Sequence, residues 1–308
     1  MERMTLTTEQ SDVPTARGTA RATALGAAVG AALAGPLVST QWLCDHLGSD
    51  GLVVVDASVA AVAGEGGTTY VGAVEQYETG HLPGAVFADL LDAFSDPTAR
   101  FPFTRPDAEA FAAAATALGV DAGTTVVVYD SAVGQWASRL WWLFRSFGHD
   151  RVAVLDGGVT KWRDEGRPLE SGRAAPAPSG GFAARELPGF WSDRADVAAV
   201  LDGDRPGTLV CGTPPKDFAA RHIPGSVSAP AVRLVDRATN AFLPAADLHG
   251  LVADVRASPD PIVAYCGGGI AAAADALALA LLGRDDVTVY DGSLTEWVSD
   301  PTAPLARA

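Results

Sequence analysis

The chain has 308 residues, of which 48% are hydrophobic and 19% are charged, a composition typical of a folded globular protein rather than a disordered one. Domains commonly run to about 100–150 residues, so this length predicts two of them. The formal charge of −15 repels nucleic-acid phosphates and anionic lipid surfaces, so we expect neither nucleic acid nor a membrane as a partner.

The N-terminal segment 1–35 is a polar leader that ends in a stretch of mostly Ala and Gly, from Ala22 to Ala34. This stretch lacks the large aliphatic residues that drive membrane insertion, so it predicts no transmembrane span. We interpret residues 1–35 as a disordered tail, with a targeting signal as the alternative. A cytoplasmic location is the corresponding expectation.

The remainder of the chain contains an internal repeat, which fixes the number of domains. Three pairs of segments match in the same order, at offsets of 141, 136 and 135 residues: Gly80–Val86 with Arg221–Val227, Val126–Asp130 with Ile262–Cys266, and Val154–Trp162 with Val289–Trp297. We place the two copies at residues 36–168 and 183–308. The segment 169–182 between them lies in a stretch rich in Pro, Gly, Ser and Ala, and is expected to be a linker.

Each copy begins with a short run rich in β-branched residues, Leu52–Val55 or Thr208–Val210, which is typical of a buried parallel strand. Helical patterns occur between the strand candidates, at 107–118, 137–147, 195–201 and 271–282. This alternation predicts an α/β fold of two domains, each with a mostly parallel central sheet flanked by helices.

The cysteines are Cys44, Cys211 and Cys266. They form no CxxC pair and no spacing suited to a structural metal, so we expect free thiols, with no disulfide scaffold and no metal site. Cys266 follows the strand candidate Ile262–Tyr265, and the carboxyl ends of parallel strands are where reactive groups collect. The loop that it opens reads Cys266-Gly267-Gly268-Gly269-Ile270-Ala271, and a helix is expected to begin at its end.

This arrangement favours a reactive thiol at Cys266. A helix N-terminus and unpaired backbone N–H groups lower the pKa of a thiolate, and glycines allow several N–H groups to point into one concavity. Such a concavity holds an anion or the terminal sulfur of a persulfide. The alternative is that Cys266 is a small core residue at the end of a strand.

Several motifs resemble those of the tandem rhodanese family, which includes thiosulfate and mercaptopyruvate sulfurtransferases. The resemblance extends from Leu37 to Trp297 and is most specific at Leu37–Leu43, Gly80–Ala85, Arg139–Phe144, Gly148-His149, Tyr290–Ser293 and Glu296-Trp297. It implies that Cys266 takes a sulfane sulfur from thiosulfate or mercaptopyruvate as a persulfide and passes it to cyanide or a thiol. It also implies that no cofactor is required and that the first copy, with Asp130 in place of the cysteine, is not catalytic.

The sequence departs from the family pattern in the second copy. Cys211-Gly212-Thr213 stands where the family has Asp-x-Arg, and Gly268 and Ala271 replace a frequent serine and the usual threonine of the loop. These losses raise an alternative of another class: a catalytically weak sulfur-binding or regulatory module that has kept the fold. We favour the enzyme because a degenerate copy would be expected to lose its cysteine first.

Two further residues are candidates for the site. Arg221, which precedes His222, could replace the missing arginine and pair with a substrate carboxylate, or it could be a surface residue. Cys211 ends a strand of the same sheet as Cys266, so the two thiols are expected to open toward one crevice, where Cys211 could form a disulfide or accept sulfur. The alternative is that Cys211 is inert and only fills space. His81 and His222, in Pro-Gly turns, are expected to satisfy backbone groups.

Overall fold

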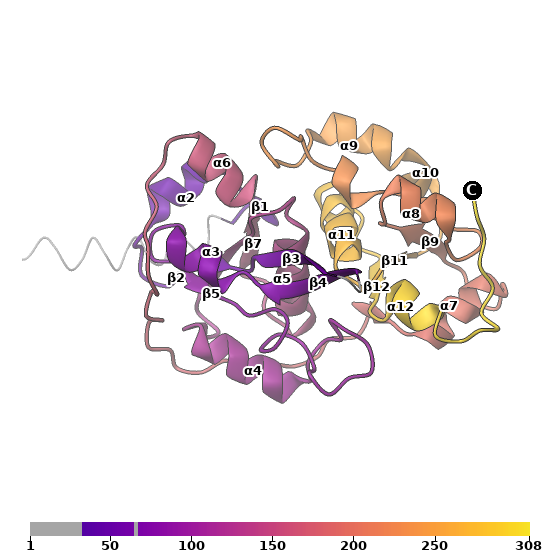
Figure 1. The fold of residues 1–308 in the computed structure, drawn as a ribbon, viewed down its shortest axis with the longest axis horizontal. Coiled ribbons are helices and arrows are strands. Elements are labelled where there is room, and N and C mark those ends of the chain that lie inside the picture. The colour runs from indigo at the N-terminus through magenta and orange to yellow at the C-terminus, as the bar shows by residue number, and fades with distance from the viewer. Residues whose placement is uncertain (1–32, 65–66) are drawn as a thin grey trace, which may run out of the picture.

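The structure is a computed structural model that describes residues 33–64 and 67–308 (Figure 1). Most of the predicted N-terminal tail, 1–35, therefore lies outside the described residues. Within them, two α/β domains follow one another along the chain. No helix in the described ranges is long and apolar enough to cross a membrane.

The first domain contains a five-stranded parallel sheet in the order β1-β7-β6-β2-β5. Its strands are β1 (Leu37–Val38), β2 (Leu52–Asp56), β5 (Val86–Phe87), β6 (Thr125–Tyr129) and β7 (Val152–Leu155). An antiparallel hairpin of β3 (Val59–Gly64) and β4 (Gly67–Gly72) follows β2 and stands apart from the sheet. β6 is buried along its whole length, because it lies at the centre of the sheet and is covered on both faces.

The second domain repeats this topology strand for strand. Given from the matching edge, its order is β8-β12-β11-β9-β10. Its strands are β8 (Trp191–Ser192), β9 (Thr208–Cys211), β10 (Val227–Ser228), β11 (Ile262–Tyr265) and β12 (Val287–Tyr290). β11 occupies the central position that β6 has in the first domain. The predicted repeat and the predicted α/β fold class, with a mostly parallel sheet in each domain, are confirmed.

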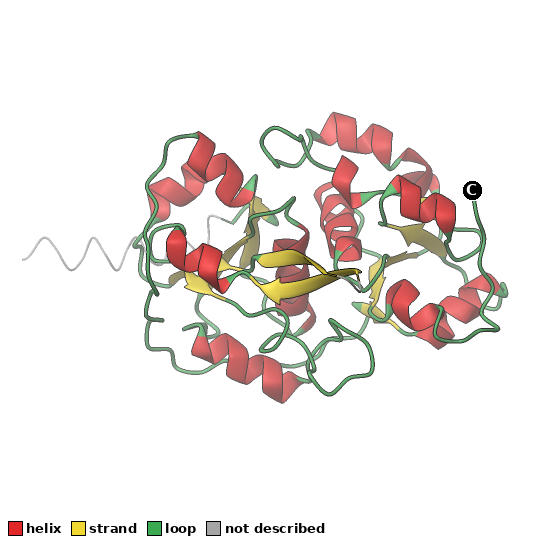
Figure 2. Ribbon diagram, in the orientation of Figure 1, coloured by secondary structure: helices red, strands yellow, loops and turns green. Residues whose placement is uncertain are grey.

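Helices surround both sheets (Figure 2). In the first domain they are α2 (Thr40–His46), α3 (Val74–Thr79), α4 (Ala108–Ala117), α5 (Gln135–Ser146) and α6 (Gly158–Asp164). In the second they are α7 (Arg194–Leu201), α8 (Pro215–Ala220), the 3₁₀ turn η1 (Ala231–Arg233), α9 (Ala245–Leu251), α10 (Ala253–Ala257), α11 (Ala271–Leu281) and α12 (Ser293–Trp297). The four predicted helices correspond to α4, α5, α7 and α11, with ends that differ by no more than two residues.

The two domains meet along α5 and α11, which pack against each other between the sheets (Figure 1). One continuous hydrophobic cluster includes residues of both sheets and of both helices. Two separate clusters cover the outer faces of the two sheets. The loops that follow β6 and β11 open into α5 and α11, so both loops lie at the junction between the domains.

The segment 169–182 packs on the first domain. Glu170 pairs with His81 in an isolated β-bridge, and the Phe182 amide donates to Thr116 Oγ1 over 2.8 Å. The Phe182 side chain belongs to the central hydrophobic cluster. The linker role and the domain boundaries that we assign from the sequence stay a prediction.

Candidate active site

Cys266 lies at the carboxyl end of β11, with 3% of its surface exposed. Its backbone is held at the N-terminus of α12: the Cys266 amide donates to Ser293 Oγ over 3.1 Å, and its carbonyl accepts from the Leu294 amide over 3.0 Å. The next carbonyl, of Gly267, accepts from both the amide and the hydroxyl of Thr295. The start of the loop is therefore fixed, and α11 begins at Ala271 as predicted.

The corresponding loop of the first domain shows what such a backbone binds. Asp130, buried at the end of β6, accepts four amide hydrogen bonds of 2.9–3.0 Å. One carboxylate oxygen binds the amides of Ala132 and Gly134, and the other binds those of Trp136 and Ala137. The loop and the first turn of α5 thus form a cradle for an anion, made of backbone groups alone.

The matching loop of the second domain has a different backbone conformation: Gly134 has φ +81°, whereas the matching Ile270 has φ −84° and the left-handed residue is Gly269. At the offset of 136 residues, the amides that hold Asp130 correspond to those of Gly268, Ile270, Ala272 and Ala273. The Ala273 amide donates to the Ile270 carbonyl, whereas the other three amides have no acceptor among residues 33–64 and 67–308. These three backbone N–H groups are therefore available to bind an anion.

The middle of the Cys266 loop is held by a residue of the other domain. Gly269 has a left-handed φ of +78°, and a Cβ there would lie 2.8 Å from the Asp291 carbonyl and 3.2 Å from Arg139 Nη1. Arg139, from α5, is 2% exposed; its Nη2 donates to Asp291 Oδ1 over 2.6 Å and to the Phe103 carbonyl over 2.7 Å. The glycine is therefore required by this close approach as well as by its φ.

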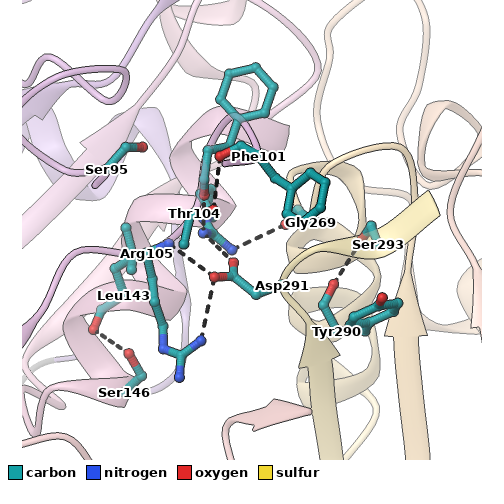
Figure 3. Close-up of polar contacts among 12 residues, drawn as sticks. Ser95, Phe101, Thr104, Arg105, Leu143, Ser146, Gly269, Tyr290, Asp291 and Ser293 are labelled. Atoms are coloured by element: carbon teal, nitrogen blue, oxygen red, sulfur yellow. Dashed lines mark hydrogen bonds and ion pairs between the residues drawn. The ribbon is translucent and has the colours of Figure 1, made fainter. Parts of the chain in front are cut away.

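Asp291 is the shared partner of two arginines (Figure 3). Its second oxygen, Oδ2, accepts from the Arg105 amide over 2.9 Å and lies 3.4 Å from Arg105 Nη1. Arg105 Nε also pairs with Glu186 over 3.1 Å. The guanidinium groups of Arg105 and Arg139 both lie over the Trp191 ring, 5.2 and 4.7 Å from its centroid. Two carboxylates thus neutralise the two cations that approach the loop from the first domain.

Ser293 adopts a backbone conformation that favours glycine. Its φ is +49°, and it is fully buried, with Oγ donating to the Tyr290 carbonyl over 2.8 Å (Figure 3). The matching residue of the first domain is Gly158, with φ +53°. A serine in this region is strained, so its retention points to a use for the hydroxyl, which here accepts the Cys266 amide.

The structure does not bring the thiols of Cys211 and Cys266 into one crevice. Cys211 pairs in register with Tyr265, the residue before Cys266, and successive residues of a strand face opposite sides of a sheet. Cys211 accordingly belongs to the outer hydrophobic cluster with Tyr265, whereas Cys266 belongs to the central one. Burial raises the pKa of the Cys211 thiol, which keeps it protonated. This packing favours the alternative interpretation, an inert buried residue.

The other candidates are Arg221 and the two histidines of the Pro-Gly turns. Arg221 is exposed at the C-terminal end of α8, and its side chain makes no hydrogen bond or ion pair with the described residues. His81 and His222 each place Nδ1 2.9 Å from the carbonyl of the residue four positions earlier, and stack on the ring of that residue. Among residues 33–64 and 67–308, no three His, Cys, Asp or Glu side chains are arranged to hold a metal ion.

Sequence reasoning did not identify Arg139, Asp291, Ser293 or Phe103 as parts of the site. Three of these residues lie in motifs that carry the family resemblance, but no spacing indicates that α5 of one copy reaches the loop of the other. The repeat holds one usable signal. Arg139 and Asp275 occupy matching positions, so a charged residue appears in the buried face of the interface helix of each copy.

Two copies of one parallel α/β domain, of which only the second has a cysteine at the head of its interdomain loop, define a tandem rhodanese-like architecture. The rhodanese-like domain family model matches residues 39–165 and 195–300. Thiosulfate/3-mercaptopyruvate sulfurtransferase 1 of Arabidopsis thaliana is 34% identical, over 88% of this chain and 78% of that protein. The 3-mercaptopyruvate sulfurtransferase of Homo sapiens is 36% identical, over 85% and 91%.

The crystal structure of SseA from Escherichia coli, a 3-mercaptopyruvate sulfotransferase, superimposes with a TM-score of 0.75 at 32% identity, covering 84% of this chain and 98% of SseA. The chain belongs to the tandem rhodanese family of thiosulfate and 3-mercaptopyruvate sulfurtransferases.

Proposed function

We propose that this chain is a sulfurtransferase in which Cys266 carries the sulfur. The Cys266 thiolate attacks the outer sulfur of thiosulfate or the thiol sulfur of 3-mercaptopyruvate, and the S–S or C–S bond that joins this sulfur to the donor breaks, with its electron pair staying on the leaving group. Sulfite or the enolate of pyruvate leaves, and Cys266 holds a persulfide. Cyanide or a thiolate then attacks the terminal sulfur, which departs as thiocyanate or a new persulfide and returns Cys266 to the thiolate.

One observation carries this proposal: the Asp130 carboxylate accepts four amides of the first domain's loop, and three of the four amides at matching sequence positions in the Cys266 loop have no acceptor among the described residues. Such donors stabilise a thiolate and a persulfide anion without a side-chain cation. The names of the relatives agree with this chemistry. The loop composition, Cys-Gly followed by small residues, favours mercaptopyruvate over thiosulfate as the donor.

Turnover with each donor, measured as thiocyanate formed from cyanide, tests the proposal. Cys266→Ser should remove activity by about a thousandfold or more, because the nucleophile is lost. Cys211→Ser, a change of the same size at a buried position on the other face of the sheet, should retain it. Activity that survives Cys266→Ser in folded protein would contradict the proposal. No turnover in the wild type would favour the alternative of a catalytically weak sulfur-binding module.

We propose Arg221 as the anchor of a donor carboxylate. Its counterpart in the first domain, Gly80, borders a hollow of about 450 Å³ that is also lined by Asp56 and Ser131, at the carboxyl edge of that sheet. Arg221→Ala should raise KM for mercaptopyruvate far more than for an uncharged persulfide donor. Equal changes for both donors would assign Arg221 to the solvated surface.

The partners in this proposal are a small-molecule sulfur donor and a thiol or cyanide acceptor. Nucleic acid is not among them, since the chain carries a net charge of −15. A cytoplasmic location is part of the same proposal.

A further inference from the structure

An aromatic side chain of the first domain lies against the Cys266 loop. Phe103 has a left-handed φ of +63°, and its carbonyl is bound by Arg139. A Cβ built on Gly268 would lie 3.0 Å from the Phe103 ring, so the ring touches the second glycine of the loop. The strained backbone of Phe103 is therefore held where it presents an aromatic surface to the loop.

Two more aromatic rings extend this surface away from the loop. Tyr70 of β4 and Trp136 of α5 lie edge-on to Phe103 and to each other, with centroids 5.5–5.8 Å apart. Trp136 is buried, but Tyr70 remains 43% exposed although it contacts both rings. We call Phe103, Tyr70 and Trp136 the aromatic wall. It runs from the catalytic loop to solvent along the β3–β4 hairpin, which Figure 1 shows beside the second domain.

An aromatic ring also lies beside the first domain's own loop, since a Cβ on Gly134 would lie 3.4 Å from the Phe242 ring. The residue that matches Phe103, at an offset of 137 residues, is Asn240, which also has a left-handed φ, +55°. Its side-chain amide donates to the Ala132 carbonyl over 2.8 Å, in the Asp130 loop. The residue with the left-handed φ is thus polar at the Asp130 loop, where Phe242 supplies the nearby ring, and is itself the aromatic residue at the Cys266 loop.

Beside the aromatic wall, the charged side chains around the Cys266 loop are already paired with one another. Arg139 and Arg105 are paired with Asp291 and Glu186, so the four groups sum to zero. The body of a molecule that approaches Cys266 along the hairpin meets aromatic rings rather than a free cation.

We propose that the aromatic wall is a subsite that selects, as sulfur acceptor, a small thiol with an apolar or aromatic body. The inference rests on the proposed function, since it concerns the second half of the transfer. The acceptor thiolate attacks the terminal sulfur of the Cys266 persulfide and forms a new S–S bond. The bond to Cys266 Sγ breaks, its electron pair stays on Sγ as a thiolate, and no oxidant or reductant is consumed.

The test uses full-length protein whose persulfide has been formed with mercaptopyruvate and freed of donor. Decay of the persulfide is followed with benzyl mercaptan, 2-mercaptoethanol and cyanide, and each thiol rate is divided by the cyanide rate. We expect wild type to prefer benzyl mercaptan over 2-mercaptoethanol by about tenfold, since one aromatic contact contributes about that much. Tyr70→Ser should remove most of this preference, and Tyr70→Phe should keep it.

Val71→Ser is the matched control. Val71 is the next residue of β4, is 42% exposed, and faces the other side of the hairpin, so its change should leave the preference intact. Equal rates for the two thiols in wild type, or a preference that survives Tyr70→Ser, would overturn the subsite and leave the sulfurtransferase proposal standing. Failure to form the persulfide with any donor would overturn the proposed function and the subsite together.

Discussion

In the first domain, the loop after β6 is closed by its own Asp130 carboxylate, which takes four amide hydrogen bonds. In the second domain, the loop after β11 begins with Cys266 and leaves three of the matching amides without a protein acceptor. The first loop thus satisfies these amides with its own carboxylate, and in the function we propose the second loop uses them to bind an anion or a persulfide sulfur. Under the proposed function, one residue type at the end of the central strand, Asp130 or Cys266, separates a structural copy from a reactive one.

Among the changes considered, replacement of Arg139, which contacts the Cys266 loop from the first domain, is expected to lower the free energy of unfolding most. Arg139→Met leaves Asp291 buried with Arg105 as its remaining ion-pair partner, so the free energy of unfolding should fall by about 3–5 kcal/mol. Urea unfolding with paired activity assays measures this. Arg105→Met is the control: Arg105 is about one-third exposed, and its loss should cost about 1 kcal/mol or less. Equal costs for the two changes would mean that the Arg139 pair does not hold the loop.

Asp130→Ala should damage the structural copy without affecting chemistry. Four buried amides lose their charged acceptor, which should lower the free energy of unfolding by about 3 kcal/mol. Turnover per folded molecule should stay near the wild-type value, because Asp130 does not touch the Cys266 loop. Loss of turnover in fully folded protein would show that the first loop takes part in the reaction.

Ser293 and Gly158 occupy matching positions in the two domains, so variants of Ser293 test what the serine hydroxyl contributes. Ser293→Gly should relieve about 1 kcal/mol of backbone strain but remove the hydroxyl that binds the Cys266 amide, so kcat should fall by about tenfold. Ser293→Ala keeps the strain and loses the same hydroxyl. If both variants turn over at the wild-type rate, the hydroxyl does not position the nucleophile.

The interface helices α5 and α11 also differ in the charged residue that each buries, Arg139 or Asp275. Asp275 should make the free energy of unfolding depend on pH. Both of its carboxyl oxygens are buried without a hydrogen-bond partner, and burial raises its pKa well above the ordinary value of 3.8. The folded state therefore holds a proton that the unfolded chain releases above about pH 4, so this group's contribution to stability declines as pH rises toward its folded pKa.

Asp275→Asn removes the titration while preserving shape beside Gly212. Its free energy of unfolding relative to wild type should therefore rise between pH 4 and pH 7, with a slope of up to about 1.4 kcal/mol per pH unit. Measuring both proteins at each pH cancels the titration of the remaining carboxylates. A difference that does not change with pH would place a compensating partner near Asp275.

The fold could be predicted from the sequence because its signals are local and repeated. Short β-branched runs, the helical patterns and the three matched segments each indicate the same α/β unit. The strand–Cys–Gly pattern also predicted that Cys266 follows β11 and that α11 begins at Ala271. The contacts across the interface were not predictable, because Arg139 meets Asp291 only after two sheets and two helices have packed.

The interpretation of Cys211 shows a different limit. Cys211 is the last residue of β9 and Cys266 follows the last residue of the neighbouring β11, so the register pairs Cys211 with Tyr265 rather than with Cys266. A shift of one residue in register moves a side chain to the other face of the sheet. Two cysteines near the ends of neighbouring strands therefore need not face each other.

The central claim, that Cys266 alone carries the sulfur, is tested most directly by mass spectrometry of the protein after exposure to 3-mercaptopyruvate or thiosulfate, with peptide mapping under non-reducing conditions. We expect one additional sulfur atom, located on the peptide that contains Cys266 and removed by cyanide, while Cys44 and Cys211 remain unmodified. Sulfur found on Cys211 or Cys44 instead, or no added sulfur with either donor, would contradict the assignment of the reactive loop.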